Sequence, residues 1–249
     1  MAYEEDIIVK NPFDFRLNVI PNTTVSHIAM TEEQSDTFLS FVKGHKHYSK
    51  YYDEYVILLE TGMRVSELVG LTLDDIDFVK RRIRVNHQLM KVKLANEGQS
   101  SYYVEETKTG NGIRYIPMTD NVYASLERII AARPSFDKEW VIDGYTGFLL
   151  FDKDKKPKVA MHIEHQMKRA LDRYNATHTD KLPKITPHCF RHTFCTNMAL
   201  KGMDIKSLEY VMGHGDCSTT LNVYTHSRYD TVEESMKKIF NCIDTKCES

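Results

Sequence analysis

The hydrophobic residues of this 249-residue chain change their spacing twice, and this change constrains the possible folds more than any other feature. From Thr31 the apolar residues recur at the period of about 3.6 that is typical of helices, and this spacing returns at Thr119. In between, at 76–86, 101–110 and 112–118, they alternate with the twofold period of strands. The pattern predicts an α+β fold that is mostly helical, with one small three-stranded antiparallel sheet. TGNG provides the tight turn between the last two strands.

Capping residues mark where the predicted helices begin and end. Thr31 and Thr119 are suitable N-caps, Gly62 ends a helix, and Pro187 suits the first turn of another. Residues 144–159 are predicted to form a short extended segment with a charged turn. The predicted helices cover 31–42, 49–62, 64–71, 119–134, 159–178 and 187–202.

Composition excludes several classes of protein. With 41% hydrophobic and 27% charged residues, the chain is large enough and apolar enough for one large globular domain or two small ones. It has no run of about 18 apolar residues, and the acidic start MAYEEDIIVK does not fit a secretion signal, so we expect a cytoplasmic protein. The five cysteines include no CxxC pair, which fits reduced thiols better than disulfides or a zinc knuckle.

The net charge of −2 is unevenly spread along the chain. Residues 79–200 hold 21 Lys and Arg against 13 Asp and Glu, a net of +8, and the rest hold 12 against 22, a net of −10. A basic middle between acidic flanks is compatible with a face that binds a polyanion such as DNA, although a solvated surface of mixed charge explains it equally well. Charge alone therefore does not decide whether the chain binds DNA.

A group of reactive side chains lies towards the C-terminus. Tyr224 stands ten residues after His214 in GHGDCSTTLNVYTH, and His188 and Arg191 stand shortly before, in HCFRH. His188 and Arg191 fall near the start of a predicted helix, where the helix dipole and the backbone N–H groups favour an anion. A phenol, two imidazoles and a guanidinium spaced in this way can attack a phosphodiester and stabilise its charge without a metal.

Four ordered motifs resemble the motif series of the tyrosine recombinase (phage-type integrase) catalytic domain: TGMRVSELVGLTLDDIDF, ETKTGNGIRYIPM, TPHCFRHTFCTNMALKGMD and MGHGDCSTTLNVYTH. The closest likeness is to integrases of conjugative transposons and runs from about residue 31 to 240. It implies in-line attack of a tyrosine on a DNA phosphate, with a 3′-phosphotyrosyl bond, a free 5′-hydroxyl and no cofactor or metal. Reversal of this step would make the chain a site-specific recombinase that integrates or excises a mobile element, with chemistry like that of type IB topoisomerases.

Three residues match those with which the family holds the scissile phosphate. Arg64 and Arg191 match two arginines whose planar guanidinium groups can each bind phosphate oxygens bidentately, and His214 matches a hydrogen-bond donor. Taken alone, Arg64 three residues before Glu67 would be a helix-surface ion pair that adds little stability, and His214 between glycines would be a helix C-cap. The order of the motifs favours the catalytic interpretation, with Glu67 as a support.

Two further matches concern the nucleophile and its activation. Tyr224 matches the nucleophile, although Tyr229 follows five residues later, and a phenol with a pKa near 10 needs neighbours to activate it. His188 matches the histidine that assists proton transfer at this tyrosine. His188 and His192 also have the spacing of a zinc-binding HExxH helix, but Cys189 occupies the position of the required glutamate.

The sixth match is Lys108 in ETKTGNG, which corresponds to a lysine that donates a proton to the leaving 5′-oxygen. This assignment has competitors, because Lys91, Lys93 and Arg114 belong to the same predicted sheet. A lysine beside two glycines, here Gly110 and Gly112, is also often no more than a solvated hairpin residue.

The domain organisation differs from that of full-length integrases of this type. We expect 1–30 to be a linker or arm and 31–249 the catalytic domain, with a C-terminal helix at about 230–243. The core-binding and arm-binding domains of such integrases are expected to be absent, because 30 residues are too few for a helical bundle. The alternative is therefore a truncated, non-catalytic DNA-binding or regulatory fragment.

Double-stranded DNA is the expected main partner. The C-terminal helix carries an apolar stripe that either docks on its own core or packs on a neighbouring subunit and links a homo-tetramer on DNA. An excision or accessory DNA-bending protein is a further candidate partner. The stripe consists of Val232, Met236, Ile239, Phe240 and Ile243.

Overall fold

Helices form about half of the described residues and strands far fewer, so the structure is the mostly helical α+β fold that was predicted. The computed structural model describes residues 29–93, 100–106 and 113–213, so the N-terminal arm, the TGNG turn and the C-terminal helix lie outside the described residues. The α-helices are α1 (Glu32–Gly44), α2 (Tyr52–Thr61), α3 (Val65–Gly70), α4 (Asp120–Ala131), α5 (Ala160–Thr177), α6 (Pro187–Leu200) and α7 (Ile205–Met212). Two 3-10 helices, η2 (Ser49–Tyr51) and η3 (Leu73–Asp75), precede α2 and the first strand.

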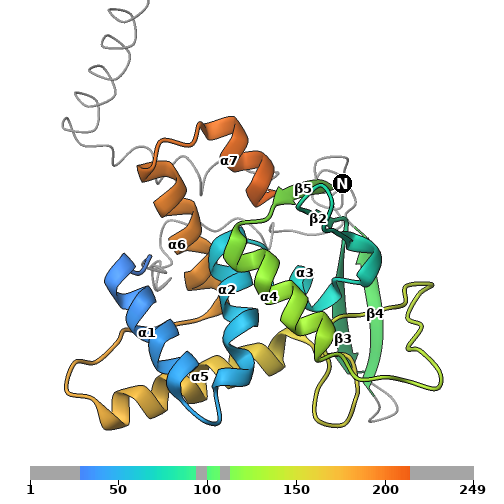
Figure 1. The fold of residues 1–249 in the computed structure, drawn as a ribbon, viewed down its shortest axis with the longest axis horizontal. Coiled ribbons are helices and arrows are strands. Elements are labelled where there is room, and N and C mark those ends of the chain that lie inside the picture. The colour runs from blue at the N-terminus through green and yellow to red at the C-terminus, as the bar shows by residue number, and fades with distance from the viewer. Residues whose placement is uncertain (1–28, 94–99, 107–112, 214–249) are drawn as a thin grey trace, which may run out of the picture.

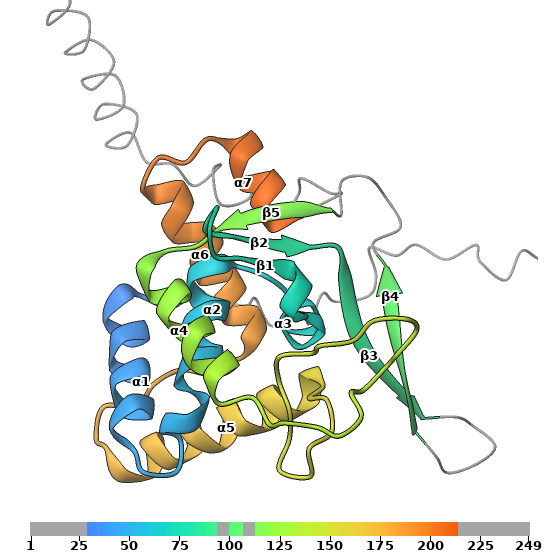
Figure 2. The same cartoon turned by 45° about the vertical axis from the view of Figure 1, so that its right-hand side comes forward.

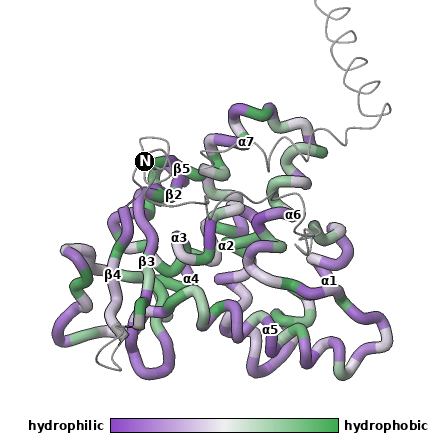
Figure 3. The backbone as a smooth tube through the Cα atoms, turned by 180° about the vertical axis from the view of Figure 1, so that it is seen from behind, coloured by the Kyte–Doolittle hydropathy of each residue, from purple (hydrophilic) through white to green (hydrophobic). Residues whose placement is uncertain are grey.

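Helix α2 lies at the centre of the helical part, against α1, α4 and α6 (Figure 1). Tyr55, Val56, Ile57 and Leu58 are all buried, so four successive residues face apolar surroundings. A helix that is hydrophobic on every side is stable only when other elements surround it. Hydrophobic stretches of backbone gather around α2 and α3, whereas hydrophilic stretches follow the outer turns (Figure 3).

The helix ends have the predicted caps. Thr31 and Gln34 form a capping box at α1, in which each side chain accepts from the other residue's backbone N–H. The Thr119 hydroxyl caps α4, and Gly62 ends α2 in the left-handed conformation. Pro187 occupies the first turn of α6, where a missing N–H costs no helical hydrogen bond.

The β-region has a three-stranded antiparallel sheet as predicted, but its strands and pairing differ from the prediction. The three-stranded sheet has the order β1–β2–β5, and β3 and β4 form a separate two-stranded sheet. The predicted strand 76–86 is two strands, because a turn that includes Arg81, with φ 48°, reverses the chain between them. The strands are β1 (Ile76–Asp77), β2 (Arg82–Val85), β3 (His87–Lys93), β4 (Ser100–Glu106) and β5 (Arg114–Pro117).

Strand β3 was not predicted. It pairs with β4, the strand that we predicted to pair with β5. Strand β4 pairs with β3, with Leu89 opposite Val104, whereas β5 pairs with β2, with Ile83 opposite Ile116. The alternating pattern of β3 is short because its buried face consists of His87 and Leu89 and ends at Lys91, which is exposed. The predicted pairing of the last two strands is therefore wrong.

The two sheets have different positions relative to the helices. The three-stranded sheet lies beneath α7, and β3 and β4 extend away from the helical body (Figure 2). Strand β5 contacts α7, and α3 packs against β3. No helix within 29–93, 100–106 and 113–213 is long and apolar enough to cross a membrane.

Candidate active site

Arg64 is the N-cap residue of α3, two positions after the left-handed turn at Gly62. Its Nη1 donates to Glu67 Oε1 at 3.0 Å, and its backbone N–H donates to Glu67 Oε2 at 2.7 Å. The Glu67 side chain is only 3% exposed, whereas that of Arg64 is 43% exposed. The pair is therefore not the helix-surface ion pair that the spacing alone suggests, since a buried carboxylate holds a partly exposed guanidinium.

Arg191 comes from α6 and is almost completely buried, with 5% exposure. Its Nη1 donates to the carbonyl oxygen of Gly62 at 2.6 Å, and its Nη2 donates to the carbonyl oxygen of Met212. Burial and the nearby Arg64 guanidinium lower the pKa of Arg191 to about 9. Because burial next to another cation disfavours its positive charge, an anion bound here would be stabilised strongly.

His188 lies in the first turn of α6, three residues before Arg191, and is exposed. The spacing of three places the two residues on neighbouring positions of one helix face. The His188 ring stands perpendicular to that of His192, with 4.5 Å between the ring centroids. The hydroxyl of Thr186 caps this helix by accepting from the backbone N–H of Cys189.

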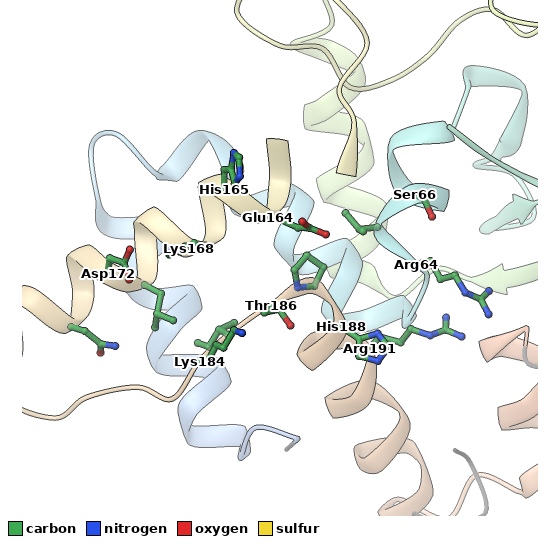
Figure 4. A pocket seen from close by; sticks show the side chains of 15 residues that line it. Arg64, Ser66, Glu164, His165, Lys168, Asp172, Lys184, Thr186, His188 and Arg191 are labelled. Carbon is green, nitrogen blue, oxygen red and sulfur yellow. The ribbon is translucent and has the colours of Figure 1, made fainter. Parts of the chain in front are cut away.

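A cleft of about 860 Å³ joins these residues to the exposed side of α5. In Figure 4, Arg64, His188 and Arg191 gather at one end, and both guanidinium groups turn away from α5. Helix α5 and the segment before α6 supply the rest of the wall. The charged residues of this part of the wall are Glu164, Lys168, Asp172 and Lys184, and His165 lies among them.

The structure thus brings together three of the six residues predicted from the motifs, Arg64, His188 and Arg191. Lys108, His214 and Tyr224 lie outside the described residues, as does the competitor Tyr229. The left-handed cap of α7 falls on Gly213, with φ 61°, and His214 is the next residue in the sequence.

Arg114, which the sequence suggests only as a competitor of Lys108, has a different position in the structure. Arg114 is 1% exposed and donates to both carboxylate oxygens of Glu67, so it is not positioned as a proton donor to DNA. The alternation of β5 contains a signal for its burial, because Arg114 shares a face with the buried Ile116.

Comparison with known proteins identifies the family. Residues 29–231 match the sequence model of the phage integrase family. The chain belongs to the phage integrase family. The resemblance to tyrosine recombinases, and to integrases of conjugative transposons in particular, is therefore confirmed, and so is the α+β fold class of their catalytic domain.

Two relatives and one solved structure show how far this membership extends. The chain is 44% identical over 240 residues to the transposase from transposon Tn916 of Enterococcus faecalis, covering 96% of this chain and 58% of the relative. It is 27% identical over 237 residues to a XerC-like tyrosine recombinase of Caldanaerobacter subterraneus, covering 90% and 58%. A Tn1549 transposon integrase solved with a circular intermediate DNA is 42% identical, with a TM-score of 0.86 and coverage of 96% and 74%. The chain thus spans 58% of the length of these two curated relatives.

Proposed function

We propose that this chain carries the strand-cleaving and strand-joining activity of a site-specific DNA recombinase that integrates or excises a mobile element. The observation that carries the proposal is the pairing of two guanidinium groups, Arg64 and Arg191, beside His188 at one end of an open cleft. Arg64 pairs with the buried carboxylate of Glu67, whereas Arg191 is hydrogen-bonded to two neutral carbonyl groups, so the site has excess positive charge and a phosphodiester supplies the missing anion. The relative solved with circular intermediate DNA supports DNA as the ligand.

In the proposed reaction the phenol oxygen of Tyr224 attacks phosphorus in line with the leaving 5′-oxygen. A P–O bond to the tyrosine forms while the bond to the 5′-oxygen breaks, which leaves a 3′-phosphotyrosyl ester. His188 assists the loss of the phenol proton, and Lys108 gives a proton to the leaving oxygen. The reverse reaction with another 5′-hydroxyl reseals the strand.

Negative charge develops on the phosphate during this attack, and the arginines would stabilise it. Arg64, Arg191 and His214 would hold the non-bridging oxygens, and Arg191 is already oriented by two carbonyl groups before DNA arrives. Preorganised donors in a partly desolvated site stabilise a transition state more than donors in water do. The reaction on this proposal needs no metal or other cofactor.

A non-catalytic, regulatory fragment that only binds DNA is the alternative. A protein that merely binds the DNA backbone needs surface lysines and arginines, which are easily solvated. Such binding does not require a buried arginine like Arg191, which the carbonyl oxygens of Gly62 and Met212 orient even without DNA. The arrangement therefore favours the enzyme.

The remaining parts of the proposal concern organisation. Residues 31–249 would form the catalytic domain, and further DNA contacts would come from core-binding and arm-binding regions like those of full-length integrases. The apolar stripe at about 230–243 would pack on a neighbouring subunit and link a homo-tetramer on double-stranded DNA. An accessory DNA-bending protein would direct excision, and the reaction would take place in the bacterial cytoplasm.

Covalent capture on a suicide substrate tests the proposed activity. The protein is incubated in EDTA with a duplex nicked near the cleavage site, so that the short 5′-hydroxyl fragment diffuses away, and the product is run on a denaturing gel. We expect a protein–DNA adduct with the unchanged protein and with Tyr229→Phe as a matched control, and no adduct with Tyr224→Phe. Lack of an adduct with the unchanged protein, or an adduct that persists in Tyr224→Phe, would contradict the proposal.

A further inference from the structure

Among the described residues, Arg114 is one of the largest fully buried side chains, and the proposed reaction gives it no task. It is the first residue of β5 and is 1% exposed. Charged side chains are almost never buried to this extent unless they are paired, because the cost of desolvation must be offset. Its partners therefore indicate its function.

Glu67 is the main partner of Arg114, and it is also the partner of Arg64. Nη1 and Nη2 of Arg114 donate to the two oxygens of Glu67 at 3.0 and 2.8 Å, and Nη1 of Arg64 donates to Oε1 at 3.0 Å. Burial has the largest single effect on Glu67 and opposes its ionisation, but the hydrogen bonds and positive charges of Arg114 and Arg64 together outweigh it and leave the pKa of Glu67 below its ordinary value. One buried carboxylate is thus fixed by Arg114 on its inner side and orients Arg64 on its outer side.

The C-terminal end of α7 is the second partner. The last carbonyl groups of a helix lack intrahelical donors and lie at the negative end of its dipole. Nε of Arg114 donates to the carbonyl oxygen of Val211 at 2.7 Å, and Arg191 donates to that of Met212. Nη2 of Arg64 is 3.4 Å from the carbonyl oxygen of Gly213. Three arginines from three elements therefore converge on three successive carbonyl groups.

Gly213 shows how closely Arg114 packs against this turn. A Cβ atom added at Gly213 would lie 2.7 Å from Nη1 of Arg114, which is closer than real Cβ contacts. The guanidinium therefore fills the space beside the last residue before His214. A lysine at position 114 has one nitrogen and cannot bind both oxygens of Glu67 and the carbonyl of Val211 with the same geometry.

We propose that Arg114 is a positioning residue for DNA cleavage, which sets the Arg64 guanidinium through Glu67 and anchors the end of α7 on which Arg64 and Arg191 also rest. The inference rests on the proposed strand-cleaving activity. Arg64 is 43% exposed and has a long side chain, so its position depends on Glu67. Small displacements of a group that stabilises charge in the transition state cost about 100-fold in rate.

Single-turnover cleavage of the suicide duplex by Arg114→Lys tests this role. At saturating protein we expect the rate of adduct formation to fall by about 10- to 100-fold, while the Kd for the duplex changes by less than about threefold. Arg133→Lys is the matched control, because Arg133 is also a largely buried arginine, with 12% side-chain exposure. It donates to Glu139 Oε2 at 2.6 Å and to the carbonyl oxygen of Phe148 at 2.8 Å. Its replacement should leave the cleavage rate unchanged.

A methylphosphonate at the scissile position separates positioning from a purely structural role. This group replaces one charged non-bridging oxygen by a neutral methyl, so it removes the charge that Arg64 would stabilise. We expect the deficit of Arg114→Lys to shrink to less than about threefold on this substrate. A loss of folded protein would instead slow both substrates equally, and all rates are normalised to the folded fraction measured by circular dichroism.

An unchanged rate in folded Arg114→Lys, or an equal deficit on both substrates, would overturn the inference and leave the proposed activity intact. Lack of an adduct with the unchanged protein would overturn the proposed activity, and this inference with it. If Arg114→Lys does not fold, Glu67→Gln weakens the connection from Arg114 through Glu67 to Arg64 while keeping the shape of the side chain. An unchanged rate, or an equal deficit on both substrates, would then overturn the inference.

Discussion

Arg64 and Arg191 reach the same end of the cleft, but their surroundings give them different properties. Arg64 is half-exposed and depends on the buried carboxylate of Glu67 for its position. Arg191 is buried and is oriented by the carbonyl oxygens of Gly62 and Met212. Charges interact more strongly where water is excluded, so Arg191 provides a desolvated charge, whereas Arg64 provides a partly solvated charge that the buried carboxylate of Glu67 holds in place.

Removal of the Arg64 guanidinium should slow cleavage without unfolding the protein. Loss of one preorganised donor to a developing oxyanion typically costs about 100- to 1000-fold in rate, and we expect this for Arg64→Ala in the suicide-duplex assay. Glu67 keeps its hydrogen bonds from Arg114, so the fold should persist.

Arg84 offers a matched control for this change. Its side chain is 40% exposed, close to the 43% of Arg64, and its Nε donates to the fully buried Asp75 at 3.2 Å. Since Arg84 is not among the residues that line the cleft, Arg84→Ala should keep the cleavage rate within about threefold. Equal losses in the two variants would show that the effect of Arg64 is not specific to the phosphate.

The link between α2 and α3 shows how the elements fix the site. Gly62 ends α2 with φ 63°, its carbonyl oxygen accepts from Arg191, and Arg64 follows two residues later. A Cβ atom at Gly62 would lie 2.3 Å from a ring carbon of Phe194 in α6. The turn therefore determines at once the course of the chain, the packing of α2 on α6 and the spacing of the two arginines.

Gly62→Ala should lower the free energy of unfolding by about 1–3 kcal/mol, because it adds a clash and a strained backbone. Gly44, at the end of α1, is the matched control, since nothing lies within 4 Å of an added Cβ. Gly44→Ala should be neutral or stabilise by up to about 1 kcal/mol through its better helix propensity. Urea unfolding of both variants measures the difference, and equal stabilities would contradict the tight contact at Gly62.

Local signals were sufficient to predict α1 to α6, but they predicted neither α7 nor the pairing of the strands. The N-caps Thr31 and Thr119 and the first-turn proline Pro187 depend on neighbouring residues only, so the sequence alone predicted them correctly. Whether 101–110 pairs with 112–118 or with β3 depends on contacts between distant segments, which a twofold period does not specify.

The candidate site, like the fold, could be predicted only in part. The motifs identified Arg64, His188 and Arg191, which the structure places together. The roles of Arg114 and Gly213 could not be predicted, because they depend on the meeting of β5, α3 and α7, segments that are far apart in the sequence.

On the scale of the whole molecule, the site depends on contacts between distant parts of the chain. Arg64 and Arg191 come from α3 and α6, and both reach the end of α7. At the start of the described chain, the backbone N–H of Met30 donates to the hydroxyl of Thr193 in α6 at 2.9 Å, and Met30 itself is buried. The helix that carries His188 and Arg191 is thus held to the first part of the described chain.

Deletion of residues 230–249 should abolish cooperative assembly on DNA and leave the fold intact. The deletion removes the apolar stripe that we propose to pack on a neighbouring subunit. Deletion of 244–249 is the control, because it keeps the stripe. Analytical ultracentrifugation with a duplex site measures assembly, and thermal unfolding measures the fold. Assembly that survives the longer deletion, or unfolding caused by it, would show that the helix does not link subunits.

Chemical mapping of the covalent adduct tests the central claim most directly. The adduct formed in EDTA is digested with nuclease and protease, and the modified peptide is sequenced by mass spectrometry, while the released DNA end is tested for direct labelling by polynucleotide kinase. The account predicts a 3′-phosphate on Tyr224 and a free 5′-hydroxyl on the released strand. A 5′-linkage, a modified residue other than Tyr224, or an adduct that forms only when a divalent metal is present would contradict it.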